Sequence, residues 1–513
     1  MQMLRLPPYL THGYSGGTEN EPNNTEGMQM ELFSDQPGDE GLPGRERGLA
    51  MTAVMMMTTM AVFDGSMVNV ALPQIARALN VTAGSAVWVS NSYLLSAAMT
   101  LAIFAALAGR VGFRALFETG LSVFTLASAG CALSSSLDML IFMRVLQGIG
   151  GAATLSIGPA ILRSVFPNRV LGRILGLNAL LIATSTAISP VIGGTILSAM
   201  SWQWLFAINI PLGIVAVILT LRVIPGKTAS SREPFDFAGA ILSAVALGAL
   251  IMAAGAFSRP EGGTYALSEL TTAMTYGLTA VVAGVAFVWR QRRAPKPLLP
   301  LSMFASSRFS LAALTSLASF VSQGITFVAL PFLFQSVYGY SAFYSALLFT
   351  PWPIGIILAA PHAGRLADRY PSAIISTVGL CLFAAGLVLL AQLPDHANVW
   401  DIGLRSLLCG IGFGCFQSPN NREMLSNASR ENSGYASGVL AIMRTFGQCL
   451  GAAFVGIILS IYVQSASDPL KSVMQEAQAV QLSLWVAVAA TLLAIIISVS
   501  RLRNTGGLLQ KTP

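Results

Sequence analysis

The chain has 513 residues, of which 54% are hydrophobic and only 10% are charged, and its mean hydropathy is +0.67. A soluble chain carries about 25% charged residues, so the composition excludes a soluble globular protein and indicates a polytopic membrane protein. The net charge of +7 does not predict nucleic-acid binding, because the basic residues lie in short loops between apolar segments. The five cysteines form no CxxC pair and the three histidines are scattered, so we expect no metal site and no cofactor.

Residues 1–47 are polar and contain no apolar run, which predicts a disordered cytoplasmic tail. Fourteen apolar segments follow, each long enough to cross a bilayer, which takes about 20 residues in a helix. Strands of a β-barrel would be only about 10 residues long, so we predict an all-α membrane protein. The predicted spans are 49–73, 86–108, 115–134, 138–162, 174–199, 204–224, 236–257, 268–289, 309–336, 342–363, 372–393, 399–419, 435–463 and 480–500.

The loops between these spans predict their orientation. If the N-terminus lies in the cytoplasm, most of the loop arginines and lysines also fall on the cytoplasmic side, and the outer loops hold only Arg77, Arg259 and Lys471. Cytoplasmic loops of membrane proteins carry such an excess of basic residues. We therefore expect the N-terminus and the C-terminus in the cytoplasm.

The seventh and eighth spans are flanked by polar, arginine-bearing linkers at 225–235 and 290–308. Neither span carries an interior charge, so we interpret them as a peripheral pair inserted between two six-helix halves. Many transporters consist of two such halves, with the substrate site at their interface near the midplane. The predicted regions are an N-terminal bundle at 48–224, a linker with two additional spans at 225–308, a C-terminal bundle at 309–500 and a cytoplasmic tail at 501–513.

One carboxylate, Asp64, lies well inside the first span. A charge at that depth is costly and usually serves a function in a polar cavity or with a partner. Arg144 in the fourth span shares a helix face with Gln147, Gly148 and Gly151. Asp64 and Arg144 both lie roughly 9–14 Å below the outer ends of their spans, at 1.5 Å per residue, so we expect them to meet or to share a water. The alternatives are a structural Asp64 paired with a neighbouring helix and an Arg144 satisfied by carbonyls.

Several motifs resemble those of one known family. Residues 64–73 (DGSMVNVALP), 88–93 (WVSNSY), 144–151 (RVLQGIGG) and 202–213 (WQWLFAINIPLG) resemble, in this order, signatures of the first, second, fourth and sixth helices. The family is the major facilitator superfamily, in its fourteen-span drug:proton antiporter branch (QacA and EmrB type). Residues 412–421 (GFGCFQSPNN) are similar to uncharacterised enterobacterial transporters of this superfamily. The resemblance covers about residues 48 to 500 and implies two six-helix bundles plus two extra central helices.

The same resemblance indicates residues that gate the transport path. In the fifth span, Ser189, Pro190, Gly193 and Gly194 resemble the antiporter motif of exporters. Generic packing by small residues is the alternative. The loop after the second span departs from the family's gate motif, because Gly109 stands where an acid is expected, whereas the loop after the tenth span keeps Asp368. The predicted gating residues are Arg110, Gly112, Arg114, Ser189, Pro190, Gly193, Gly194, Gly364, Arg365, Asp368 and Arg369.

Aromatic and amide side chains in the spans are candidates for the lining of a substrate cavity suited to lipophilic cations. Scattered aromatics in membrane helices are more often packing or interface residues, which is the alternative interpretation. The predicted cavity residues are Trp88, Asn91, Tyr93, Gln147, Asn209, Gln323, Gln335, Trp352, Phe416, Gln417, Asn420, Arg444 and Gln448.

Together these features predict a transporter rather than an enzyme. The chain has no P-loop of the form GxxxxGK[ST], so we expect a proton gradient to drive export, with Asp64 and Arg144 as the proton-coupling pair. The predicted function is proton-coupled efflux of lipophilic, cationic drugs or dyes by a monomer in the bacterial inner membrane. With a single deep acid, we expect monovalent cations to be exported better than divalent ones. The alternative is a carrier of the same fold for one metabolite, working as an exporter or as a proton symporter.

Overall fold

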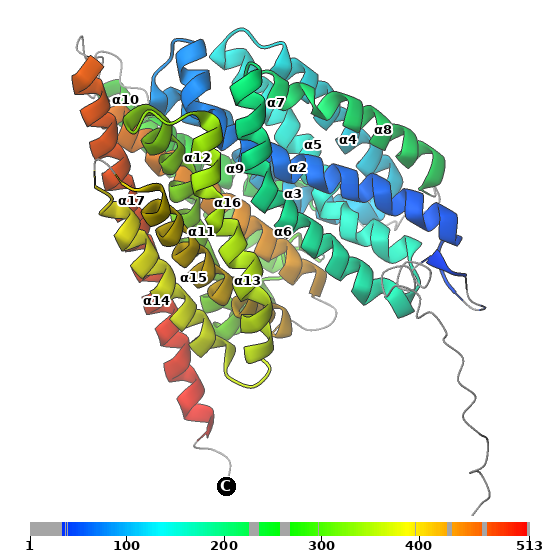
Figure 1. The fold of residues 1–513 in the computed structure, drawn as a ribbon. Helices are drawn as coiled ribbons and strands as arrows, with labels where there is room; N and C mark the ends of the chain where they lie inside the picture. Colours follow the sequence, from blue (N-terminus) through cyan, green and yellow to red (C-terminus); the bar gives the residue numbers. More distant parts are fainter. Residues whose placement is uncertain are drawn as a thin grey trace, which may run out of the picture.

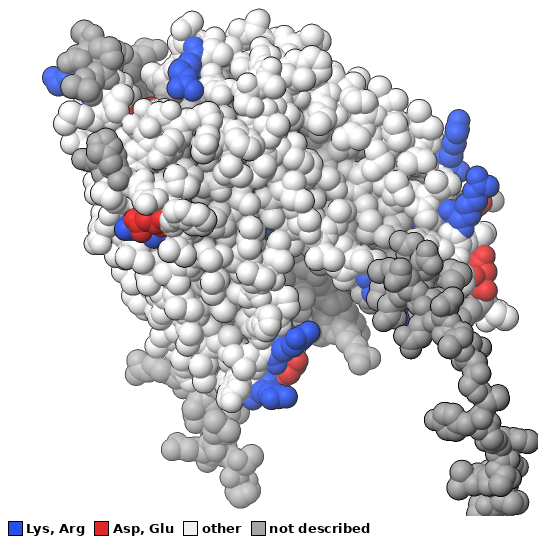
Figure 2. Space-filling model, viewed as in Figure 1, with Lys and Arg blue, Asp and Glu red and all other residues white. Residues whose placement is uncertain are grey.

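The computed structural model of the chain describes residues 33–35, 37, 39–224, 235–256, 267–295, 297–394, 397–427, 433–463 and 469–509. Within these ranges, 14 helices are long and apolar enough to cross a membrane, which confirms the predicted fourteen-span all-α fold. Figure 2 shows a broad uncharged surface with charged side chains near its margins, as expected for a protein surrounded by lipid. The predicted linker at 225–235 lies outside the described residues except for Phe235.

The N-terminal half contains the first six spans. Hydroxyl side chains cap two of its helices, because Thr82 accepts a hydrogen bond from the Ser85 N–H and Ser136 accepts one from the Met139 N–H. The sixth span is divided into a short first helix and a longer second one. The helices are α2 (Gly44–Ala78), α3 (Ala83–Val111), α4 (Phe113–Ala132), α5 (Leu137–Val165), α6 (Asn168–Ala199), α7 (Trp204–Ala207) and α8 (Asn209–Val223) (Figure 1).

The C-terminal half repeats this pattern with six further spans. A 3-10 turn, η3 (Leu301–Ala305), precedes it, and the first span ends in a π-helical turn, η4 (Leu333–Val337), just after Pro331. Proline removes one helical hydrogen bond, which accounts for irregular winding at this point. The helices are α11 (Ser307–Phe332), α12 (Ala342–Phe349), α13 (Pro351–Leu366), α14 (Ser372–Ala391), α15 (Val399–Ser426), α16 (Ser433–Tyr462) and α17 (Pro469–Leu509) (Figure 1).

The two halves meet where α3 contacts α16, where α6 contacts α12 and α13, and where α2 contacts α11 and α12. We call the end at which α2 begins and α17 ends the termini end, and the other the far end. The far end is closed by direct packing. A Cβ atom added to Gly194 of α6 would lie 2.8 Å from the Ala342 carbonyl oxygen of α12. Gln335 of η4 also donates a hydrogen bond of 2.7 Å to the Val70 carbonyl of α2.

The two additional spans, α9 (Phe237–Gly255) and α10 (Leu267–Arg293), lie outside this arrangement. α9 contacts α3 and α16, and α10 contacts α9 and η3. Asp236 ties the two helices together, because its carboxylate caps α9 through the Gly239 N–H and accepts hydrogen bonds from Arg290 (3.0 Å) and Gln291 (2.9 Å) of α10. Burial alone would raise the pKa of Asp236, but these hydrogen bonds and the charge of Arg290 outweigh it and lower that pKa.

The first and last helices extend past the predicted limits of the two bundles. At the N-terminus, α2 begins at Gly44, and Leu42 donates a hydrogen bond of 3.0 Å to the Val165 carbonyl. Arg47 is only 2% exposed and pairs with Asp35 and Asp39, so this segment is held by polar contacts that an apolar-run criterion does not detect. At the other terminus, α17 continues to Leu509, past the predicted end of the bundle at residue 500.

Candidate functional site

A central cavity of about 940 Å³ lies between the two halves. It extends to Arg422, Leu425 and Ser426 near the end of α15, and these side chains are partly or largely exposed. Figure 2 shows the molecule hollowed between the halves at its lower edge. The cavity is therefore accessible from the termini end and closed at the far end. Its described lining comes from both halves, namely from α2, α3, α5 and α6 on one side and from α11, α13, α15 and α16 on the other.

The wall of the cavity is mostly apolar, with charge at two positions. Among its described lining residues, Arg422 and Arg444 are the charged ones, and none is acidic. Asp64 is absent from the lining, although Gly65 and Ser66 beside it are present. The cavity therefore presents cations rather than a carboxylate to a bound molecule.

Asp64 instead lies in a buried ion pair with Arg144, as the depth estimate predicted. Its side chain and that of Arg144 are both 0% exposed, and Arg144 Nη1 donates to Asp64 Oδ2. The other carboxylate oxygen, Oδ1, accepts hydrogen bonds from Gln147 Nε2 at 2.8 Å and Asn209 Nδ2 at 3.4 Å. This network joins α2, α5 and α8, so a change in the charge of Asp64 acts on three helices of the N-terminal half.

Gln147 connects the ion pair to a fourth helix. Its side-chain oxygen accepts a hydrogen bond of 2.7 Å from Arg144, and its nitrogen also donates to Ser128 of α4 at 2.8 Å. A lone serine in an apolar span gives no sequence signal, so Ser128 was not predicted. Arg144 also donates to the Val89 carbonyl of α3 at 2.9 Å, and its Nη2 has no hydrogen-bond partner among the described residues.

Tyr93 separates this ion pair from the cavity. The guanidinium of Arg144 lies 4.3 Å from the centre of the Tyr93 ring and 5.6 Å from that of Phe206. Tyr93 also lines the cavity, so one side chain contacts both the buried cation and the space that a substrate would occupy. A cation over an aromatic face is stabilised by about 2 kcal/mol or more when desolvated, so movement of Tyr93 affects Arg144 directly.

The structure brings some of the predicted cavity residues to the lining and places others elsewhere. Besides Tyr93, those at the lining are Gln323, Gln417, Arg444 and Gln448. Gln147 and Asn209 belong to the Asp64 network described above.

Four predicted cavity residues pack between helices instead. Trp88 faces α9, because its ring fills the space beside Gly255. Asn91 accepts a hydrogen bond of 2.9 Å from Cys449 Sγ of α16. Trp352 and Phe416 are fully buried in a cluster of aromatic rings. These residues hold helices together, as Gln335 does at the far end. The sequence could not show this, because it does not tell which neighbour a helix face meets.

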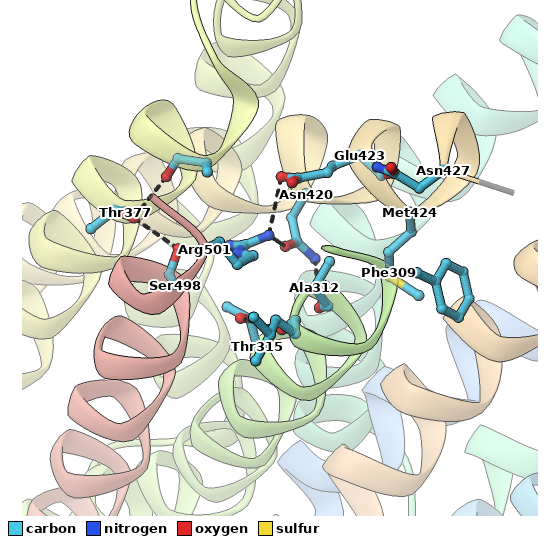
Figure 3. Close-up of polar contacts among 12 residues, drawn as sticks. Phe309, Ala312, Thr315, Thr377, Asn420, Glu423, Met424, Asn427, Ser498 and Arg501 are labelled. Carbon is cyan, nitrogen blue, oxygen red and sulfur yellow. Dashed lines mark hydrogen bonds and ion pairs between the residues drawn. The ribbon is translucent and has the colours of Figure 1, made fainter. Parts of the chain in front are cut away.

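Asn420 belongs to a separate polar cluster in the C-terminal half (Figure 3). Its side chain donates to Ser316 of α11 at 2.8 Å and accepts a hydrogen bond of 2.8 Å from Arg501 of α17. Arg501 is 1% exposed and also pairs with Glu423 at 3.2 Å. This cluster ties α17 to α15. This polar cluster was not predicted from the sequence, because Arg501 falls in the predicted tail at 501–513.

Asp368 pairs with Arg422 at the termini end of α13 and α15. Arg422 also approaches the Gly364 carbonyl at 3.5 Å, whereas Arg365 and Arg369 are exposed. Both partners of the pair are at least half exposed and both lie in the C-terminal half. In this conformation the pair therefore joins neighbouring helices of one half and does not bridge the two halves.

The corresponding loop of the N-terminal half makes different contacts. Arg110 lies 5.1 Å from the centre of the Phe235 ring, ahead of α9, and Arg114 donates to the Leu221 carbonyl of α8 at 2.7 Å. Gly112 separates α3 from α4 with φ of +97°, a conformation that favours glycine. This loop contacts the linker and the sixth span without any carboxylate at position 109.

The predicted exporter motif of α6 lies at the junction of three helices. Ser189 donates a hydrogen bond of 3.1 Å to the Phe63 carbonyl of α2, directly before Asp64. A Cβ at Gly193 would lie 3.0 Å from the Met67 side chain of α2, while Gly194 faces α12. Pro190 lines a small apolar pocket between α2 and the C-terminal half. These residues allow α6 to lie close to α2 of its own half and to α12 of the C-terminal half.

Two helical halves around a cavity that is accessible from one end are the architecture of a membrane transporter. The chain belongs to the Major Facilitator Superfamily, whose family model matches residues 54–452. The protein is therefore a transporter and not an enzyme, which confirms that prediction.

Three relatives are similar to this chain over most of its length, and two of them are named for the molecule that they transport. The chain is 42% identical over 422 residues to the uncharacterized transporter YebQ of Escherichia coli (strain K12), covering 82% of this chain and 91% of that protein. It is 30% identical to the tetracenomycin C resistance and export protein of Streptomyces glaucescens (82% and 77% covered). It is 26% identical to the riboflavin transporter RibZ of Clostridioides difficile (strain 630) (90% and 99% covered).

The fold also matches solved structures. One is the crystal structure of a bacterial homolog to the human lysosomal transporter Spinster, with a TM-score of 0.64 and 14% identity over 91% of this chain and 97% of that one. At this identity the match concerns the fold alone.

Proposed function

We propose that the protein exports amphipathic small molecules across the bacterial inner membrane in exchange for protons, with Asp64 as the proton-carrying group. The observation that supports this most is the buried Asp64–Arg144 ion pair, which is separated from a large cavity by Tyr93. A proton on Asp64 would cancel its charge and leave Arg144 without its counter-ion. Because the pair joins helices of the N-terminal half, protonation would favour a different arrangement of those helices.

The predicted direction of transport follows from the loops. With both termini in the cytoplasm, the termini end faces inward, and a cavity accessible from that end is ready to load a molecule from the cytoplasm. Similarity to the tetracenomycin C resistance and export protein supports export. Similarity to a riboflavin transporter supports the alternative, a carrier for one metabolite, and a broad range of exported compounds would exclude it.

The expected preference for cationic substrates is not part of this proposal. It depended on a carboxylate within reach of the substrate, and Asp64 is instead fully buried and paired with Arg144. The expected difference between monovalent and divalent cations depended on the same carboxylate, so it is not part of this proposal either.

Transport in everted membrane vesicles tests the proposal. A fluorescent substrate found in a whole-cell efflux panel is presented outside the vesicles, which acidify internally, and its accumulation is followed. We expect Asp64→Asn to lower gradient-driven accumulation by at least about tenfold, a typical size for coupling between two binding events. Asp138→Asn, which removes an exposed acid at the start of α5, should leave it unchanged. Equal accumulation by Asp64→Asn and the parent, at equal protein level, would refute the role of Asp64.

A further inference from the structure

Arg444 of α16 is the cation of the cavity that lacks a counter-ion. Arg422, the other arginine of the described lining, pairs with Asp368. Arg444 is exposed to the cavity and makes no hydrogen bond or ion pair with any described residue. An unpaired cation at membrane depth is costly, and such residues usually mark a substrate or ion pathway.

Amide groups lie next to Arg444. Gln448 follows it by one helical turn and donates a hydrogen bond of 2.9 Å to the side-chain oxygen of Gln323 on α11. This bond leaves the NH₂ group of Gln323 without a protein acceptor among the described residues, and both glutamines line the cavity. A guanidinium and an amide donor on adjacent helices are suited to a carboxylate, which accepts paired N–H hydrogen bonds.

The remaining wall sets the shape of the rest of the ligand. Leucine, isoleucine and phenylalanine side chains from both halves, including Leu94, Leu155, Phe320 and Ile356, surround a volume of about 940 Å³. Cavities of this kind bury drug-sized molecules through apolar contact, while a few polar groups fix their orientation.

From these features we propose that the cavity binds amphipathic organic acids, with Arg444 holding the carboxylate and the apolar wall holding the body of the molecule. This inference rests on the proposed transport function and names its substrate class. It reverses the charge preference predicted from the sequence, because the carboxylate that suggested cations is already neutralised by Arg144.

Binding to the full-length protein in lipid nanodiscs tests the inference without any proton gradient, so that failure of proton coupling leaves the result intact. The probes are anthracene-2-carboxylate, its uncharged methyl ester and an anthracene that bears a trimethylammonium group, and binding is followed by fluorescence. We expect the carboxylate to bind most tightly. Arg444→Gln should weaken carboxylate binding by about tenfold or more, the effect of losing charged hydrogen bonds, and leave ester binding unchanged.

Two variants complete the design. Arg444→Lys, which keeps the charge, should retain part of the affinity for the carboxylate. Arg292→Gln is the control, because it removes an exposed arginine at the end of α10, outside the described cavity lining, and it should change carboxylate binding by less than about fivefold. Tighter binding of the trimethylammonium probe, equal loss of ester and carboxylate binding in Arg444→Gln, or no binding of the carboxylate would each overturn the inference.

Discussion

At the scale of single residues, the network around Asp64 is a buried polar cluster that connects several helices of the N-terminal half. Its carboxylate receives donors from Arg144, Gln147 and Asn209, and buried polar groups are costly when a partner is lost. The charge state of one side chain is therefore linked to the positions of several helices.

We predict that Gln147→Leu lowers proton-driven transport. The substitution removes the Gln147 hydrogen bond to Asp64 and leaves Asn209, at 3.4 Å, as the remaining amide donor to Oδ1. A hydrogen bond to a charged group contributes about 1.5–3 kcal/mol, and about 1.4 kcal/mol is a factor of about ten in an equilibrium constant. Gradient-driven accumulation in everted vesicles should therefore fall by about tenfold or more.

The control for this loss is Gln481→Leu, which changes a glutamine of α17 that lies outside the described cavity lining and makes no hydrogen bond to Asp64. It should leave accumulation unchanged. Parental accumulation by Gln147→Leu, at normal protein level, would show that the hydrogen bond to Asp64 does not matter for transport.

The sequence predicted that Asp64 and Arg144 meet or share a water, because both lie at the same depth in their spans. It did not predict that Tyr93 contacts both the cation and the cavity, since a motif does not give the direction of a ring. Trp88 and Asn420 were misplaced for the same reason. Their residue types suit a cavity, but helix rotation and a neighbouring helix turn them towards Gly255 and Arg501 instead.

At the scale of helices, α6 carries the contact that closes the far end. A Cβ atom at Gly194 would lie 2.8 Å from the Ala342 carbonyl oxygen and 2.9 Å from the Ala346 Cβ, which is too close for either neighbour to stay in place. The contact between α6 and α12 therefore depends on glycine at this position.

We predict that Gly194→Ala weakens the closed far end. Overpacking of a tight contact costs about 1–3 kcal/mol, so the population with a separated far end should increase. Spin labels at Met200 and Tyr344, both exposed at the far end, would report this separation. Their distance is measured by double electron–electron resonance. We expect a longer-distance population in Gly194→Ala.

Gly176→Ala provides the matched control. Gly176 lies on the same helix, and a Cβ there meets nothing within 4 Å, so both variants gain the same helix propensity and only one disturbs the contact. Identical distance distributions in the two variants would show that Gly194 does not determine closure.

At the scale of the whole molecule, hydropathy predicted the number of spans because crossing lipid requires long apolar helices. It set the limits of the bundles inside α2 and α17, whose residues Arg47 and Arg501 beyond these limits are buried among polar partners. Hydropathy treats such residues as tail, although an arginine that is buried among polar partners belongs to the packed structure.

The arrangement of charges also limits how protons and substrate are coupled. Protonation of Asp64 adds positive charge near the cavity, which by itself would favour an organic acid at Arg444 rather than release it. Exchange therefore has to be carried by the change in helix packing when the Asp64–Arg144 pair separates, with Tyr93 as the contact between the pair and the substrate. Because coupling between two binding events is reciprocal, the proton and the substrate must favour different conformations of the protein.

The most direct test measures proton movement against a substrate gradient in proteoliposomes that contain the purified protein and a trapped pH indicator. A substrate from the efflux panel is loaded inside, diluted outside, and internal pH is recorded without any imposed proton gradient. The account predicts that substrate efflux through the parent acidifies the interior, and that Asp64→Asn gives no acidification. Alkalinisation of the interior, which would mean that protons leave with the substrate, or full acidification by Asp64→Asn would contradict it.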